Sequence, residues 1–336
     1  MINYIIAIPI VVGFLATLFL IPSWIKAAKK AKFVGKDMHK FENEEIAEGG
    51  GLPVVAGFTL GVLIYIALVT FFFEGDTNLI EIFAIVCVVL IASFVGFVDD
   101  LFGWKIGLSK KLRMFLVIAS AIPLIVINAG ESLVEIPFVG SVNLGLIYPL
   151  IIIPIGVLGA STTFNFLAGY NGLEARQGIL ILGALGVATW FMGNRWLTTI
   201  ILCMIAPLIA FLFFNAFPAR IFPGDVMTYS VGVLIATIAI MGNIERFAVF
   251  IFIPNIIEVF LKIRGKLRVE SFGKPNKDGE LDTPYKKIYS LSHIAIKILE
   301  KSKGKAYEKD IVLLINVFQL VVIVIGFILF RRGIFG

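Results

Sequence analysis

Long apolar runs fill most of this sequence, and they constrain its fold more than any other feature. Hydrophobic residues make up 59% of the 336 residues, whereas charged residues make up 15%. A soluble globular chain has about 45–50% apolar and about 25% charged residues, so it could not cover this much apolar surface. The same hydrophobicity excludes a disordered chain. We therefore expect an all-α polytopic membrane protein whose apolar surface is covered by lipid.

A transmembrane helix needs about 20 mostly apolar residues to cross the hydrocarbon core of a bilayer. On this criterion we predict about ten transmembrane helices, all within a single multi-pass domain that spans residues 1–336. The predicted spans are 2–25, 52–73, 79–98, 112–128, 146–168, 178–193, 197–217, 226–242, 247–263 and 311–330.

The Lys and Arg residues are distributed unequally between the two sides of these spans. Of 29 such residues, 25 fall in connections on one side, and only Arg195, Arg246, Arg331 and Arg332 fall on the other. The positive-inside rule then predicts that the basic side is cytoplasmic and that both termini lie outside. Contacts with anionic lipid headgroups explain the net charge of +6, so no nucleic-acid partner is expected. The expected location is the cell membrane, or the endoplasmic reticulum membrane in a eukaryote.

Two connections carry structure of their own. Residues 133–144 alternate in hydrophobicity around Gly140, which predicts a small external hairpin. The connection 264–310 is a long cytoplasmic loop, in which turn-forming residues predict a second hairpin. In its second half, apolar residues at helical spacing lie opposite lysines, which predicts an amphipathic helix over 286–301 on the membrane surface.

Polar residues that could take part in catalysis or metal binding lie at the ends of three predicted spans. Asp99 and Asp100 end the third span, where the helix dipole disfavours carboxylates and a metal ion or a lysine would compensate them. Asn165 lies in the fifth span, and Asn171 and Glu174 follow it. Simpler interpretations remain for each motif alone: a solvated acidic helix end for the aspartates, and helix–helix contact or a turn for the asparagines.

A further carboxylate, Asp225, begins the eighth span directly after Phe222, Pro223 and Gly224. Taken alone, Asp225 could simply cap that helix. All of these residues, however, fall at the cytoplasmic edge, together with the glycine-containing segments 35–40 and 46–51 and the lysines Lys110 and Lys111. Carboxylates, amides, lysines and exposed backbone on one membrane face suit a complex of Mg²⁺ with a diphosphate.

Four stretches in this order, GKDMHK with IAEGGG, DDLFGWKIGLSKK, NFLAGYNGLEA and NAFPARIFPGD, resemble the polyprenyl-phosphate N-acetylhexosamine-1-phosphate transferase family. The chain is most similar to the eukaryotic and archaeal branch, which uses UDP-GlcNAc and dolichyl phosphate. The resemblance implies transfer of GlcNAc-1-phosphate to dolichyl or polyprenyl phosphate, with release of UMP, as the start of lipid-linked glycan assembly. It also implies Mg²⁺ as cofactor, with Mn²⁺ as the alternative, and a homodimer as an oligomeric state to consider.

Roles for individual residues follow from the same resemblance. Asp225 and Asn165 would be the metal ligands. Asp99, Asp100 and Lys111 would be catalytic, with Lys110 as the phosphate-binding alternative to Lys111. The uridine part of the substrate would contact the remaining candidates, which are Gly35, Glu48, Asn171, Glu174 and Phe222.

The sequence also departs from the family pattern in ways that leave the donor sugar open. Gly103 and Thr162 replace polar family residues, and the 264–310 loop lacks the family's His and Arg signatures. UDP-GalNAc or another UDP-hexosamine is therefore the alternative donor. A membrane transporter is a remote alternative, because transporters place ionisable groups near the bilayer midplane rather than at its edge.

Overall fold

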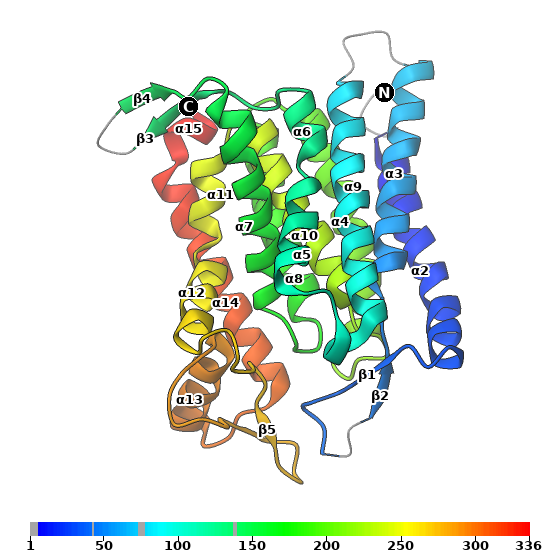
Figure 1. Cartoon of the computed structure of the whole chain (residues 1–336), viewed down its shortest axis with the longest axis vertical. Helices are drawn as coiled ribbons and strands as arrows, with labels where there is room; N and C mark the ends of the chain where they lie inside the picture. The colour runs from blue at the N-terminus through cyan, green and yellow to red at the C-terminus, as the bar shows by residue number, and fades with distance from the viewer. Residues whose placement is uncertain (1–5, 42–43, 73–77, 137–139) are drawn as a thin grey trace.

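A computed structural model describes residues 6–41, 44–72, 78–136 and 140–336 of the chain. Figure 1 shows one bundle of roughly aligned helices with short hairpins at both ends. The start of α2 (Ala7–Lys30) and the C-terminus lie at the same end as strands β3 (Leu133–Ile136) and β4 (Gly140–Asn143). At the opposite end lie helix α13 (Leu291–Lys303) and the strand pair β1 (Val34–Lys36) and β2 (Glu45–Ala47).

Seven helices in the described part of the chain are long and apolar enough to cross a membrane. Large apolar side chains on their outer surfaces are exposed, such as Phe71, Phe94 and Phe213, as expected for surfaces that face lipid. The fold is therefore that of a polytopic membrane protein. The seven are α2 (Ala7–Lys30), α3 (Gly51–Phe72), α4 (Leu79–Ile106), the π-helical turn Tyr148–Ile152 with α7 (Ile153–Phe166), α9 (Arg195–Asn215), α10 (Gly224–Met241) and α14 (Glu308–Leu329).

The other three predicted spans are also helical: two are divided into shorter helices, and one forms a single helix that is not among the seven. Segment 112–128 is divided into α5 (Lys110–Ala119) and α6 (Ile122–Val126), and segment 247–263 into α11 (Glu245–Ile251) and α12 (Ile253–Arg264). Pro123 and Pro254 lie just after these breaks, where a missing backbone N–H interrupts the helical hydrogen bonds. The third segment forms α8 (Leu173–Phe191), and the last helix, α15, covers Arg331–Phe335.

Helix α10 lies at the centre of the bundle and is buried along nearly its whole length from Val226 to Ile240. It packs against α4 on one side and α7 on another. Glycines allow both close approaches: a Cβ added at Gly96 would lie 2.6 Å from the Asp225 backbone, and one at Gly232 would lie 2.6 Å from the Ser161 Cα. The start of α10 is thereby held against α4 at Gly96, and the middle of α10 against α7.

Both predicted hairpin regions contain paired strands. Strands β3 and β4 form an antiparallel pair with Val134 opposite Val142. Within the 264–310 loop, β5 (Lys274–Pro275) pairs with β6 (Leu281–Asp282), and α13 follows.

The position of α13 differs from the prediction. Its apolar side chains, including Leu291, Ile296 and Leu299, are buried among residues of α14 and the 167–173 segment. The prediction that this face lies on the membrane surface is therefore wrong, because the protein itself covers it.

Candidate active site

The C-terminal part of α4 and the start of α10 meet through Asp100. The sequence predicts that this span ends just before Asp99, but α4 continues to Ile106, so both aspartates lie within the helix. The carboxylate of Asp100 accepts hydrogen bonds from the backbone N–H groups of Asp225, at 2.9 Å, and Val226, at 3.3 Å. Asp100 therefore satisfies the free N–H groups that begin α10, a stabilising position for an anion. Gly224 has φ +68°, and an added Cβ would lie 2.3 Å from Asp100 Oδ2, so the turn requires glycine.

The neighbouring carboxylate, Asp99, is buried and has a cationic partner. Arg113 Nη2 lies 2.6 Å from Asp99 Oδ2, and the backbone N–H of Leu108 donates to Asp99 Oδ1 at 2.8 Å. From the sequence, a metal ion or a lysine is expected to compensate the two aspartates. In the structure the cation at Asp99 is an arginine one turn further along α5, whereas Lys110 and Lys111 are exposed. Lys110 Nζ lies 3.5 Å from the carbonyl oxygen of Leu267.

A third carboxylate, Asp225, faces the end of α7. Asn165 Nδ2 donates to Asp225 Oδ1 at 2.7 Å and to Thr228 Oγ1 at 2.9 Å, which leaves the amide oxygen of Asn165 outside these two bonds. Among the residues that the structure describes, Arg113 is the only cation within ion-pair distance of Asp99, Asp100 or Asp225. Carboxylate, amide and hydroxyl oxygens in a site with excess negative charge fit a Mg²⁺ ion.

Beside this acidic group, the β1–β2 hairpin and the segment before α10 form a second part of the site. Phe222 donates its backbone N–H to Ala47 at 2.8 Å, which joins the two segments. A Cβ at Gly35 would lie 2.1 Å from Glu48 Oε1 and 3.2 Å from the Phe222 ring, so the three candidates Gly35, Glu48 and Phe222 are in contact. Burial, and next the charge of Asp225, raise the pKa of Glu48 to about 7.

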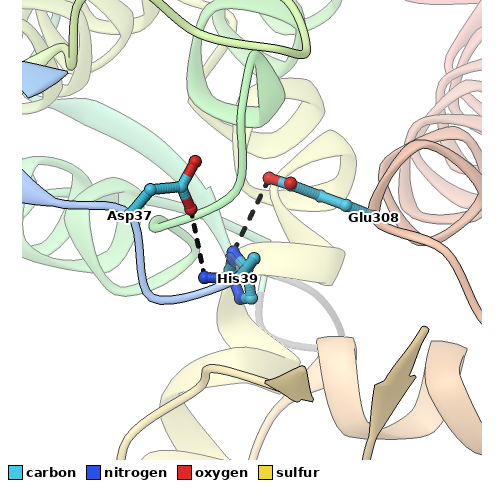
Figure 2. A group of neighbouring side chains, drawn as sticks. All are labelled: Asp37, His39 and Glu308. Carbon is cyan, nitrogen blue, oxygen red and sulfur yellow. Dashed lines mark hydrogen bonds and ion pairs between the residues drawn. The ribbon is translucent and has the colours of Figure 1, made fainter. Parts of the chain in front are cut away.

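Asn171 lies in a buried polar cluster of its own. Its backbone N–H donates to Glu308 Oε1 at 2.7 Å, and its Nδ2 lies 3.2 Å from Asp37 Oδ2. Three residues away, buried Glu174 accepts the backbone N–H of Gly169 at 2.7 Å. This bond fixes the connection between α7 and α8, which also contains Asn171. Figure 2 shows the side chains of Asp37, His39 and Glu308 close to one another.

Three residues of this region were missed by the sequence analysis. Arg113 follows the acidic pair by more than a helical turn, and Glu308 begins a helix almost 140 residues after Asn171. Neither has a local signal, because the contacts form only when distant helices pack. Asp37 does have one, since it belongs to the GKDMHK stretch that the sequence analysis singled out without naming this residue.

The fold and the site together define a class. The bundle brings together carboxylates and an amide from α4, α7 and α10 and an arginine from α5, so the chain is a multi-pass membrane protein with a polar, acidic site. The profile of glycosyl transferase family 4 matches residues 82–243, which contain all of these side chains.

Relatives extend the similarity to nearly the whole chain. A protein of Saccharolobus solfataricus, provisionally assigned as a UDP-N-acetylglucosamine–dolichyl-phosphate N-acetylglucosaminephosphotransferase, is 36% identical over 96% of each chain. A protein of Sulfolobus acidocaldarius with the same assignment is 34% identical over 92% of each. The phospho-N-acetylmuramoyl-pentapeptide-transferase of Petrotoga mobilis is 31% identical over 75% of this chain and 81% of its own. The chain belongs to glycosyl transferase family 4, so the predicted resemblance is confirmed.

Proposed function

We propose that this protein transfers GlcNAc-1-phosphate from UDP-GlcNAc to dolichyl phosphate and releases UMP. The observation that carries the proposal is the convergence of Asp99, Asp100, Asp225 and Asn165 at one end of the bundle, in a chain whose archaeal relatives are assigned this activity. The proposed topology has ten membrane crossings, with this end cytoplasmic and both termini outside. A UDP-sugar then arrives from the cytosol, and the lipid phosphate reaches the site at the headgroup plane.

In the proposed reaction, an oxygen of the lipid phosphate forms a bond to the β-phosphorus of UDP-GlcNAc, and the bond from that phosphorus to UMP breaks. The attacking oxygen is already an anion at neutral pH, so positioning and charge neutralisation supply most of the catalysis. Asp225 and Asn165 would hold Mg²⁺. When bound, the ion neutralises the negative charge that develops on the diphosphate.

The protein's own residues would position the reacting groups. Asp100 fixes the start of α10 and so places Asp225, whereas Asp99 fixes the guanidinium of Arg113. We propose that Arg113 contacts a phosphate oxygen, a role that the sequence analysis gave to Lys111 or Lys110. An arginine suits phosphate because its planar fork donates two parallel hydrogen bonds.

The uridine half of the substrate would lie between the β1–β2 hairpin and the connection between α7 and α8, which contains Asn171. Gly35 leaves room beside Glu48 and Phe222, and the Phe222 ring would stack on uracil. Glu174 keeps the connection in shape through Gly169. The loop 264–310 would meet the sugar end, since Phe272 touches Gly169 and the Tyr170 hydroxyl donates to the Ser271 carbonyl oxygen at 3.2 Å.

One experiment tests the proposed function. The purified protein, reconstituted with Mg²⁺ and dolichyl phosphate, is given UDP-GlcNAc, UDP-GalNAc and UDP-glucose in parallel, and UMP release is measured. The proposal expects the highest kcat/KM with UDP-GlcNAc. If UDP-GalNAc were preferred, the proposed reaction would stand, but its donor would be UDP-GalNAc. The absence of UMP release with any donor would refute the transferase proposal. Light scattering of the same sample tests the predicted homodimer.

Asn171→Ala is expected to raise the KM for UDP-GlcNAc at least about 10-fold and to change kcat much less. The side-chain N–H₂ of Asn171 already faces Asp37 and Glu308, so its oxygen is left to accept the N–H of uracil. Steady-state UMP release over a range of UDP-GlcNAc concentrations measures both constants. A large fall in kcat with an unchanged KM would contradict the uracil-binding role.

Glu48→Gln is expected to remove a pH dependence of stability. The pKa of Glu48 in the folded protein is about 7, above its ordinary value of 4.5, so the folded state binds more protons between these pH values. Wild-type stability should therefore fall as pH rises from about 4.5 to 7 and stay low above it. In EDTA-treated protein at pH 8, the variant should be more stable by up to about 3 kcal/mol. Equal pH profiles of Tm for both proteins would contradict this prediction.

A further inference from the structure

A buried cluster of three metal-binding side chains lies outside the phosphate site described above. Asp37 and His39 belong to the connection between β1 and β2, and Glu308 begins α14. Figure 2 shows the three side chains directed toward one another from these two segments. One potential ligand atom from each lies within 4.8 Å of the others. Only 2% of Asp37, 1% of the His39 side chain and 4% of Glu308 is exposed.

The spacing of the His39 and Glu308 ligand atoms is close to that of two ligands in a zinc site. His39 Nδ1 lies 3.6 Å from Glu308 Oε1. Two ligands about 2.1 Å from a tetrahedral Zn²⁺ ion lie about 3.4 Å apart, so this pair needs almost no movement to share an ion. Asp37 is already tied to the same turn, because its Oδ1 accepts the backbone N–H of His39 at 3.0 Å.

The two buried carboxylates also have little positive charge nearby. Among the residues that the structure describes, the cationic groups within ion-pair distance of them are His39, if it is protonated, and Lys40, whose Nζ is 3.9 Å from Asp37 Oδ2. Lys40 is bound more closely to Glu44, at 2.8 Å. Burying carboxylates without a matching charge is costly, and a divalent cation would remove that cost.

The imidazole of His39 is held in a fixed position. Its ring stacks on Tyr170 with centroids 4.1 Å apart and meets the edge of Phe272 at 5.4 Å. His39 and Glu308 both line a cavity of about 630 Å³ that reaches toward Lys277 and Phe217. The cavity gives an ion a path to the ligands, and the packed ring directs a nitrogen toward Glu308.

We propose that Asp37, His39 and Glu308 bind a Zn²⁺ ion that joins the β1–β2 connection to the start of α14. One imidazole with two carboxylates suits Zn²⁺, whereas Mg²⁺ takes oxygen ligands and prefers several waters. Because Glu308 also accepts the backbone N–H of Asn171, the ion fixes the connection that follows α7. Zinc binding here does not depend on the proposed transferase reaction, and its test is a direct binding measurement.

Zinc binding is tested on the full-length protein after treatment with EDTA, by titration calorimetry and by metal analysis of dialysed samples. All samples carry Asp225→Asn, so that the phosphate site does not contribute. We expect one Zn²⁺ per chain, and His39→Gln should weaken its binding at least 10-fold. His293→Gln is the matched control, because His293 is the other of the two histidines and lies in α13, where its Nδ1 accepts the Tyr289 N–H.

A second measurement covers the case in which His39→Gln does not fold. Co²⁺ added to the protein that carries only Asp225→Asn should give visible absorption bands of a nitrogen- and oxygen-ligated ion, and adding Asp37→Asn should weaken or shift them. Equal zinc affinity in the His39 and His293 variants, or no zinc binding below about 100 µM, would overturn the proposal. The cluster would then be a group in which His39 contacts Glu308 without a metal ion.

Discussion

Replacement of Asp225 by asparagine is expected to lower the rate of UMP release by about 10³-fold while the protein stays folded and membrane-inserted. The carboxylate of Asp225 lies at the start of the central helix and is bound by the amide of Asn165 at 2.7 Å. Asparagine has nearly the same shape and keeps an oxygen for that bond, but it lacks the negative charge that is proposed to hold Mg²⁺. Loss of one preorganised electrostatic group of this kind costs about 10²–10³-fold in kcat.

Asp282→Asn serves as the matched control for Asp225→Asn, because Asp282 is an exposed carboxylate in β6. Both variants are compared with the wild type for UMP release at saturating Mg²⁺ and for Tm in detergent. If the Asp225 variant kept more than about a tenth of the wild-type rate, Asp225 would be only a helix-capping residue. A large fall in Tm would also contradict a purely functional role, because the loss of activity could then come from unfolding.

Gly96→Ala is expected to lower activity by about 10²-fold and to destabilise the protein by about 1–3 kcal/mol. The added Cβ would lie 2.6 Å from the carbonyl carbon and oxygen of Asp225, so α4 and α10 must move apart. Overpacking of this kind typically costs 1–3 kcal/mol. Since Asp100 on α4 binds the backbone of Asp225 on α10, the same movement displaces the carboxylates, and a shift of about 1 Å can cost about 10²-fold in rate.

Gly183→Ala is the control for this prediction. Gly183 lies within α8, and an added Cβ there would meet nothing within 4 Å. The change should be neutral or slightly stabilising, because alanine favours helix more than glycine by about 1 kcal/mol. Thermal unfolding and UMP release are measured for both variants. Similar values for the two would show that contact between α4 and α10 does not position the site.

Much of the site could be predicted from the sequence because its residues interrupt apolar helices. Asp99, Asp100, Asn165 and Asp225 are each costly in lipid, so each stands out against its neighbours. Three of the four are joined in the structure by direct hydrogen bonds, Asp100 to the Asp225 backbone and Asp225 to Asn165. The sequence could not predict Arg113 as the partner of Asp99, because a cation near the membrane edge has many possible partners.

The amphipathic helix α13 shows a different limit. Its periodicity correctly predicts a helix with one apolar face, but that face is equally suited to lipid and to protein. In the structure α14 and the 167–173 segment cover it, which the sequence could not reveal. The helix breaks near Pro123 and Pro254 had a local signal in the prolines, yet a proline can also lie within an unbroken helix, as Pro207 does in α9.

The sequence by itself determined that the chain is a helical membrane protein, and which of its polar residues gather at the helix ends. Hydrophobicity and the cost of burying charge act locally, so both can be recognised one segment at a time. Only the tertiary structure decided which of these residues touch. The contact of Glu308 with Asn171 and the approach of α4 to α10 at Gly96 join segments that are distant in sequence, and they depend on how whole helices pack.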